Sequence, residues 1–227
     1  MSTQNVSFPV QSQIQFGSTS YKLYFLGNED QNIVANGDNI FFCGNGNNQV
    51  VADGGRNVFF GGNGNSTMVN KKGDAVFFGG NGNDKMINYA NAIMYGGENA
   101  DTMINNGNAK MYGEGGNDTI INNGNGVIYG GAGHDVLMNN ANAPMFGGLG
   151  NDLMVNYGNS VMYGSIGNDS IINHGEAKIY GGDGNDNIAN TGNSSIYSSN
   201  GNDSIMNGYN PEVFDYSNYL ISQRLGC

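Results

Sequence analysis

Residues 79–95 read GGNGNDKMINYANAIMY, and the next seventeen, 96–112, read GGENADTMINNGNAKMY. Each unit has a six-residue turn rich in glycine and asparagine, a short apolar stretch, a second turn and a second apolar stretch. The unit recurs every 17 residues up to the copy that begins at Ser198, and weaker copies continue upstream to Leu26 at spacings of 17 or 18. Two turns and two short strands per repeat predict one coil of a solenoid, because a unit this small needs stacked neighbours to form a core.

The predicted fold is all-β, a parallel β-solenoid of about eleven coils of 17–18 residues with a short cap at each end. The segments before Leu26 and after Asn210 do not repeat, which is why we interpret them as caps. The chain is expected to divide into an N-terminal cap, phenylalanine-rich coils, regular repeats and a C-terminal segment, at residues 1–25, 26–60, 61–210 and 211–227.

Composition narrows the possible classes of protein. Among 227 residues there are 39 glycines and no tryptophan, and asparagine is as frequent as glycine. Both residue types form helices poorly, which excludes a helical bundle, and a hydrophobic content of 38% is too high for a disordered chain. The net charge of −11 argues against nucleic acid and anionic membrane surfaces as partners, but suits cations. We expect no membrane insertion, because no 18-residue apolar run exists, and no signal peptide is visible at the N-terminus.

In a solenoid each position of the repeat becomes a column that runs from coil to coil. Two apolar columns, one per strand, are predicted to face each other and fill a narrow core, which methionine suits because it is unbranched and adaptable. The first column is Met86, Met103, Ile120, Leu137, Met154, Ile171, Ile188 and Ile205, and the second is Met94, Met111, Ile128, Met145, Met162, Ile179 and Ile196.

Asparagine forms three columns in the turns. Asparagine tolerates left-handed backbone, and stacked amides can bond to one another, so these columns are interpreted as structural. One column lies in the first turn, and two lie in the second turn, from Asn88 to Asn207 and from Asn91 to Asn210 with Glu176 as an exception.

An aspartate column cannot be structural in the same way, because stacked carboxylates about 5 Å apart repel each other. No lysine or arginine column accompanies it, since Lys85, Lys110 and Lys178 are scattered. A hard divalent cation held by carboxylates and glycine carbonyls fits best, and calcium accepts such all-oxygen sites; the alternative is a protonated or ion-free ladder. Eight aspartates enclose seven gaps, so we expect about seven calcium ions along one edge. The column is Asp84, Asp101, Asp118, Asp135, Asp152, Asp169, Asp186 and Asp203.

The segments GGNGNDKMI, GGLGNDLMV and GGDGNDNIA resemble the nonapeptide GGxGxDxUx of repeats-in-toxin (RTX) calcium-binding proteins, where U is a large apolar residue. The similarity covers residues from about Gly61 to Asn207. It implies a β-roll-like solenoid that folds with calcium, with ions between successive turns. Carried over to this chain, the ligands are the eight aspartates and turn carbonyls, represented by Gly79, Gly96, Gly113, Gly130, Gly147, Gly164 and Gly181.

The chain departs from the RTX pattern in three ways. Only one of the two turns is of the calcium type, so the ions are expected along a single edge. The first three coils carry Gln31, Asn48 and Ser66 in place of aspartate, so these coils are expected to be calcium-free, with phenylalanine packing in place of ions. No catalytic domain accompanies the repeats, and neither His134 nor His174 has a cysteine or serine partner in register, so no enzyme activity is expected.

Two further columns are expected to point outwards although they are apolar. One is tyrosine-rich and runs from Phe42 to Tyr197, and the other runs from Ile87 to Met206. They either stabilise only their own sheets or form a contact surface. Cys43 and Cys227 are expected to be an inert thiol and an exposed terminal thiol, and residues 219–225 could form a short amphipathic helix or part of a secretion signal.

These features predict a secreted, extracellular or cell-surface structural protein that is stabilised by calcium and associates with itself into a filament, surface layer or matrix. The alternative is an adhesin or ice-binding module of RTX type. A regular ice-binding surface is disfavoured, because the positions that would carry its threonines are a mixture: Asn81, Glu98, Gly115, Ala132, Leu149, Ile166 and Asp183.

Overall fold

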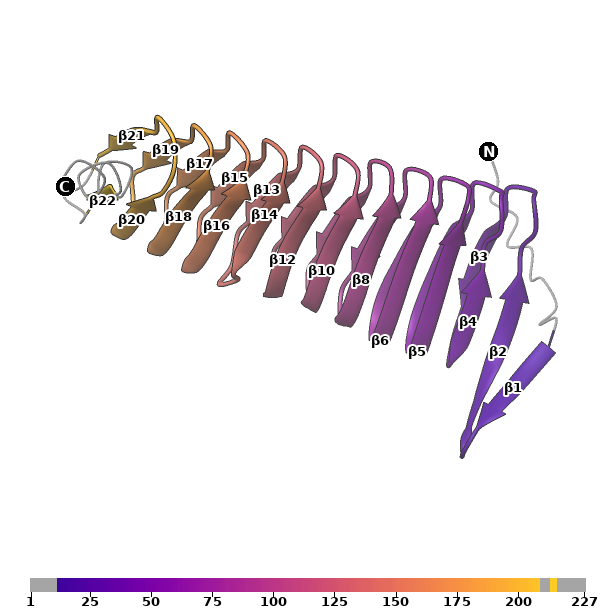
Figure 1. The fold of residues 1–227 in the computed structure, drawn as a ribbon. Coiled ribbons are helices and arrows are strands. Elements are labelled where there is room, and N and C mark those ends of the chain that lie inside the picture. Colours follow the sequence, from indigo (N-terminus) through magenta and orange to yellow (C-terminus); the bar gives the residue numbers. More distant parts are fainter. Residues whose placement is uncertain (1–11, 209–212, 216–227) are drawn as a thin grey trace, which may run out of the picture. The chain divides into compact units, whose positions relative to one another are not determined.

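The computed structural model of the chain describes residues 12–208 and 213–215, and all regular structure within them is β (Figure 1). The chain divides into two compact units, Met1–Gly115 and Gly116–Cys227. Each unit is a parallel β-solenoid, and the two together contain about eleven coils with 17-residue spacing, which confirms the predicted fold class. Cys227, residues 219–225 and most of the proposed C-terminal cap lie outside the described residues.

The first unit contains ten strands. Its coils pair in parallel at matching repeat positions, as in Met94 with Met111 and Met86 with Met103. The strands are β1 (Ser12–Phe16), β2 (Thr19–Phe25), β3 (Asn32–Ala35), β4 (Asn39–Phe42), β5 (Gln49–Gly62), β6 (Thr67–Asn81), β7 (Lys85–Asn88), β8 (Asn91–Glu98), β9 (Thr102–Asn105) and β10 (Asn108–Gly115).

The second unit has two parallel ladders, one from the first strand of each coil and one from the second. In the first ladder β11, β13, β15, β17, β19 and β21 follow one another, and in the second β12, β14, β16, β18, β20 and β22 do. The strands are β11 (Thr119–Asn122), β12 (Asn125–Ala132), β13 (Val136–Asn139), β14 (Met145–Leu149), β15 (Leu153–Asn156), β16 (Ser160–Ile166), β17 (Ser170–Asn173), β18 (Ala177–Asp183), β19 (Asn187–Asn190), β20 (Ser194–Ser198), β21 (Ser204–Asn207) and β22 (Val213–Asp215).

Both predicted core columns lie inside the coils. Every member of the second column, and every member of the first except Ile205, has 0% exposure. Full burial of a methionine or isoleucine side chain contributes roughly 1.5–3 kcal/mol to folding, so stacked coils provide the core that one coil lacks. In the first coils the second column is aromatic, because Phe41, Phe59 and Phe77 are fully buried there and stack on Tyr24.

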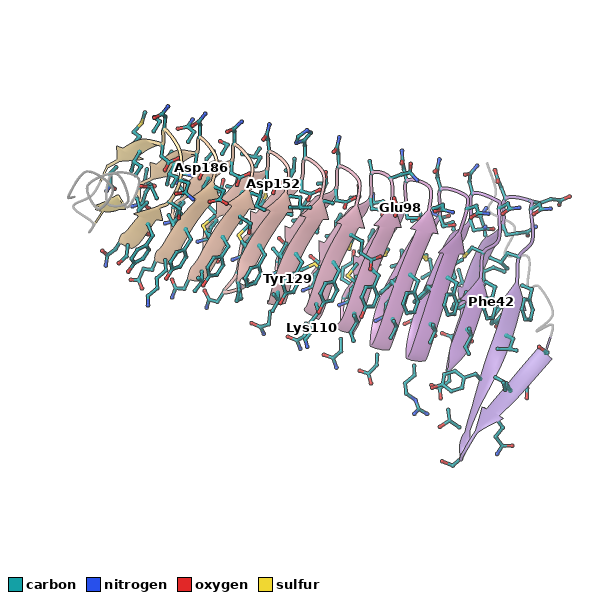
Figure 2. All side chains as sticks on the ribbon, viewed as in Figure 1. Phe42, Glu98, Lys110, Tyr129, Asp152 and Asp186 are labelled. Atoms are coloured by element: carbon teal, nitrogen blue, oxygen red, sulfur yellow. The ribbon has the colours of Figure 1, made fainter. Side chains whose placement is uncertain are left out.

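The two outer apolar columns are partly exposed except at Val155, which is buried, and this agrees with their predicted outward direction. Figure 2 shows Phe42 and Tyr129, one from each unit, on the outer face of a sheet. Ring centroids along the aromatic column are 4.9–5.2 Å apart from Phe25 to Tyr112 and 4.7–5.1 Å apart from Tyr129 to Tyr197. These stacked rings support their own sheets, as one of the two interpretations required.

The asparagine columns are structural, as predicted. In the buried column from Asn88 to Asn190, amides of each unit donate to the amide oxygen of the next coil and to a carbonyl of their own turn, as Asn156 does to Asn173 and to Gly158. In the first-turn column the asparagine side chains bond to the backbone of the next coil, as Oδ1 of Asn168 does when it accepts the backbone N–H of Asn185. These bonds pair asparagine side chains in both turns with backbone or amide groups of the same and neighbouring coils.

Two features of the N-terminal coils were not predicted. Strand β1 pairs with β2 in antiparallel fashion, unlike every other pair of strands assigned in the described residues (Figure 1). Strands β5 and β6 continue through the second turn of their coils. The extra residue of an 18-residue coil lies in this turn, because Thr67 before the turn pairs with Lys85, 18 residues ahead, whereas Asp74 after the turn pairs with Asn91, 17 residues ahead. Among the described residues there is no helix with the length and apolar character needed to span a bilayer.

Candidate metal centre

The aspartate column lies at the end of the glycine-rich turn, directly before the first strand of each coil. The structure brings the predicted residues together within each unit, and seven of the eight are buried to an exposure of 1–2%, Asp203 being the exception. Figure 2 shows Asp152 and Asp186 of the second unit along this turn edge. Buried carboxylates need partners, so the surroundings of both oxygens matter.

One carboxylate oxygen has a partner that the sequence did not reveal. Oδ1 of Asp101 and of each aspartate from Asp135 to Asp203 accepts a hydrogen bond from the backbone N–H of the aspartate in the preceding coil, as between Asp152 and Asp135 at 2.8 Å. The same bond measures 2.7–2.9 Å in neighbouring coils, and Ser66 provides the N–H for Asp84 at 2.6 Å. A backbone amide therefore stabilises half of each carboxylate, and repulsion along the column is smaller than the sequence alone suggests.

The other oxygen faces acceptors. Oδ2 is buried without a hydrogen-bond donor within the described part of the chain at Asp84, Asp135, Asp152, Asp169, Asp186 and Asp203. At Asp84, Asp135, Asp152 and Asp169 this oxygen lies beside the first glycine of its own turn and near the carbonyl of the matching glycine in the next coil, and at Asp186 it lies beside Gly181. At Gly96, an added Cβ would stand 2.7 Å from Oδ2 of Asp101 and 2.5 Å from the carbonyl oxygen of Gly113. Oxygens from two coils thus converge on a space that stays open because glycine has no side chain.

The same arrangement recurs at four of the other predicted glycines and in part at Gly181. Added Cβ atoms at Gly79, Gly130, Gly147 and Gly164 would each contact both the carboxylate Oδ2 of their own coil and the carbonyl of the next glycine, and one at Gly181 would contact the carboxylate. The φ angles of these glycines do not require glycine, since only their neighbours in the turn have positive φ, such as Gly148 at 120°. The column therefore needs glycine for space, as a site formed by carbonyl and carboxylate oxygens requires.

An upstream coil shows what a hydrogen-bonded version of this site looks like. Asn48 occupies the aspartate position, and its Oδ1 accepts the N–H of Gln31 at 3.1 Å. Its Nδ2, where an aspartate would have Oδ2, donates to the carbonyls of Cys43 at 2.8 Å and Gly46 at 2.7 Å. The backbone carbonyls of this turn therefore accept hydrogen bonds from the residue at the aspartate position. Where that residue is an aspartate, Oδ2 replaces the donor, and two acceptors face each other unless a cation or a proton lies between them.

Burial disfavours the charged carboxylates. Desolvation raises the pKa of Asp84 and Asp101 to about 7, and raises that of Asp152, Asp169 and Asp186 to about 6. The pKa of Asp135 is raised for the same reason. A cation bound at the column would remove the cause, because it neutralises the charge that burial penalises.

The oxygen-only surroundings fit calcium. Carboxylate and carbonyl oxygens are the ligands that calcium prefers, and neither a thiolate nor an imidazole is part of the aspartate column. No group of three or more histidine, cysteine, aspartate or glutamate side chains suited to a metal occurs in the described residues, so these sites depend on backbone carbonyls. Bound calcium would supply positive charge between coils, and the aspartates and glycine carbonyls would hold it.

The two histidines belong to turn columns, His134 to the glycine-rich turn directly before Asp135 and His174 to the second turn. Nδ1 of His134 accepts the backbone N–H of Asn151, the role asparagine has in neighbouring coils. His174 stacks on Tyr157 at 5.0 Å and bonds to Thr191. Both contacts are structural.

Comparison with known proteins agrees with this geometry. A family model described as the RTX calcium-binding nonapeptide repeat matches the chain in four copies, at residues 34–68, 104–137 and 180–208. No curated protein and no solved structure matches the chain. The matched nonapeptides and the parallel β-solenoid together support an RTX calcium-binding β-roll family for this chain.

Proposed function

We propose that the aspartate column and the carbonyls of its seven glycines hold about seven calcium ions along one edge of the coils, and that these ions stabilise a structural protein. The single observation that supports this most strongly is the replacement of the Asn48 amide nitrogen by a carboxylate oxygen in the coils from Asp84 on. Each such coil places oxygen against oxygen, and calcium turns that contact into an attraction.

Calcium titration of the full chain by calorimetry tests the site. We expect about seven ions per chain and a strand signal in circular dichroism that grows with calcium. Asp152→Asn should lower the number of ions bound, whereas Asp183→Asn is a matched control, because Asp183 is exposed outside the column. A strand signal unchanged by a chelator, together with no bound calcium, would contradict the proposal.

Self-association into a filament, surface layer or matrix is the second part of the proposal. Its support is the outer face of the second strands, where the aromatic column and neighbouring aliphatic residues stay partly exposed: Phe78 and Ile93 are each 37% exposed. A flat apolar face of this kind is a plausible contact between copies of one chain. The proposed location is outside the cell or at its surface, where calcium is abundant enough for weak sites.

Assembly is tested by light scattering and electron microscopy of calcium-loaded protein. Val161→Lys adds a charge on the aromatic face at a position where the next coil already carries Lys178, so the coil itself should tolerate it. We expect this variant to stay monomeric while the wild type assembles. Ile172→Lys places the same charge on the opposite sheet and should leave assembly intact. If the wild-type protein is strictly monomeric in calcium, the proposed self-association is wrong, while the proposed calcium sites are unaffected.

A further inference from the structure

The N-terminal coils carry a complete substitute for the cation. Besides the Asn48 amide, Ser66 stands at the aspartate position of the next coil, is 1% exposed and donates from Oγ to the carbonyl of Gly61 at 3.4 Å. Cys43 stands at the position of the glycine whose missing side chain opens the later sites, and its thiol is fully buried close to Ser66. Donors and a side chain thus fill the place that calcium is proposed to take from Asp84 on.

The core of the same coils is also built differently. Tyr24, Phe41, Phe59 and Phe77 form a continuous stack, with ring centroids 5.0, 5.1 and 4.6 Å apart. In register after Phe77 comes Met94, and the column stays aliphatic from there. Aromatic side chains bury more apolar area than methionine or isoleucine, and stacked pairs contribute about 0.5–1.5 kcal/mol beyond that area. The extra packing therefore coincides with the coils that lack aspartate.

The hydrogen bonds to the carboxylates of Asp84 and Asp101 run the same way, with the earlier coil donating and the later coil accepting. Oδ1 of Asp84 reaches back to the backbone N–H of Ser66, and Oδ1 of Asp101 reaches back to that of Asp84. Each carboxylate thus bonds to an amide that the preceding coil must already present. A folded Ser66 coil offers this amide before any calcium is bound.

We infer that residues 19–81, strands β2 to β6, fold without calcium and act as the template on which calcium orders the coils that begin at Asp84. The inference rests on the proposed calcium sites, but it assigns a separate role to Cys43, Asn48 and Ser66, which replace the cation. Folding around a preformed end avoids the unfavourable step of nucleating a first coil with no neighbour.

Hydrogen exchange of the full chain, read by mass spectrometry with calcium and with a chelator, tests the inference. In chelator we expect β2 to β6 to remain protected, while exchange in β7 to β9 and in the second unit becomes faster by at least about 100-fold. Loss of protection everywhere would overturn the template and leave the calcium sites standing. Full protection everywhere in chelator would instead overturn the calcium sites, so the two failures are distinguishable.

Variants test the substitute itself. Asn48→Asp removes the donor and should abolish the protection of β3 to β5 in chelator, and Asn47→Asp is the control, because this adjacent residue is exposed and Asp30 already occupies its column. The double variant Cys43→Gly with Asn48→Asp rebuilds the later site and should regain protection when calcium is added. A variant that had only lost packing would not regain protection with calcium. If calcium does not restore protection in the double variant, or if N48D keeps its protection in chelator, then Asn48 does not replace the cation.

Discussion

The backbone N–H of Asp135 donates to Oδ1 of Asp152 across one coil boundary, at 2.8 Å. This bond fixes the carboxylate so that its second oxygen points at the glycine turn, where it meets other acceptors. The coil boundary therefore combines one satisfied oxygen with one that needs a cation or a proton.

Replacing Asp152 by asparagine should stabilise the calcium-free protein. An amide keeps the acceptor for Asp135 and supplies a donor for the glycine-turn carbonyls, as Asn48 does. We expect the free energy of unfolding in chelator to rise by about 1–3 kcal/mol, the cost of an unsatisfied buried polar group. Chemical denaturation in chelator measures this, and a lower stability of D152N under those conditions would contradict it.

The calcium-free protein should be more stable in mild acid than at neutral pH. A carboxyl group whose pKa is raised in the folded state contributes stability below its unfolded pKa and loses it as pH rises through the folded value. With pKa values of about 6 for Asp152, Asp169 and Asp186 and about 7 for Asp84 and Asp101, stability in chelator should fall between about pH 4 and pH 7.

Thermal unfolding at several pH values, with and without calcium, checks this dependence. Saturating calcium should remove the loss at neutral pH, because the cation replaces the proton at the same oxygens. A melting temperature in chelator that rises from pH 4 to pH 7 would show that the buried carboxylates have other partners.

Gly147→Ala should disrupt the calcium-loaded fold. The added methyl group would contact Oδ2 of Asp152 and lie 2.7 Å from the carbonyl oxygen of Gly164, within the proposed cation site. We expect a loss of about 3 kcal/mol or more in urea denaturation with calcium present. Gly208→Ala is the control, because its nearest neighbour would be the carbonyl oxygen of Asn190 at 3.6 Å, so equal losses in the two variants would argue against a crowded site.

The adjacent residues Phe59 and Phe60 allow the stability contributions of the core stack and the outer stack to be compared. Phe59 is fully buried between Phe41 and Phe77, whereas Phe60 is half-buried in the outer stack. Phe59→Ala should reduce the free energy of unfolding by about 3–5 kcal/mol, and Phe60→Ala by clearly less. Equal effects would mean that the outer stack contributes as much as the core.

Much of the fold follows from the sequence, because one repeat determines all of its neighbours. The period predicts the coil, and alternation of side chains within it correctly assigns Met154 to the core and Tyr163 to the outer face. The aspartates of the site could be named from the sequence as well, since a carboxylate that recurs at one position of successive coils needs positive charge beside it.

Other features were not accessible from the sequence, because they depend on how backbones meet. The hydrogen bond from Asp135 to Asp152 involves an amide, which every residue but proline has and no pattern marks. The roles of Cys43 and Ser66 require knowing which side chains lie against the glycine turn. The antiparallel pairing of β1 with β2 lies outside the repeat, so periodicity says nothing about it.

The 18-residue coils place their extra residue in the second turn, while the glycine turn keeps its register, as Phe60 with Phe78 and Gly62 with Gly80 show. The two turns of a coil therefore differ in the changes of length that they tolerate. Insertions and deletions can accumulate at the second turn without moving any residue of the proposed calcium sites, whereas the number of glycine turns changes only when a whole repeat is gained or lost. Recombination between repeats would then lengthen or shorten the protein in steps of one coil, each step bringing its own carboxylate.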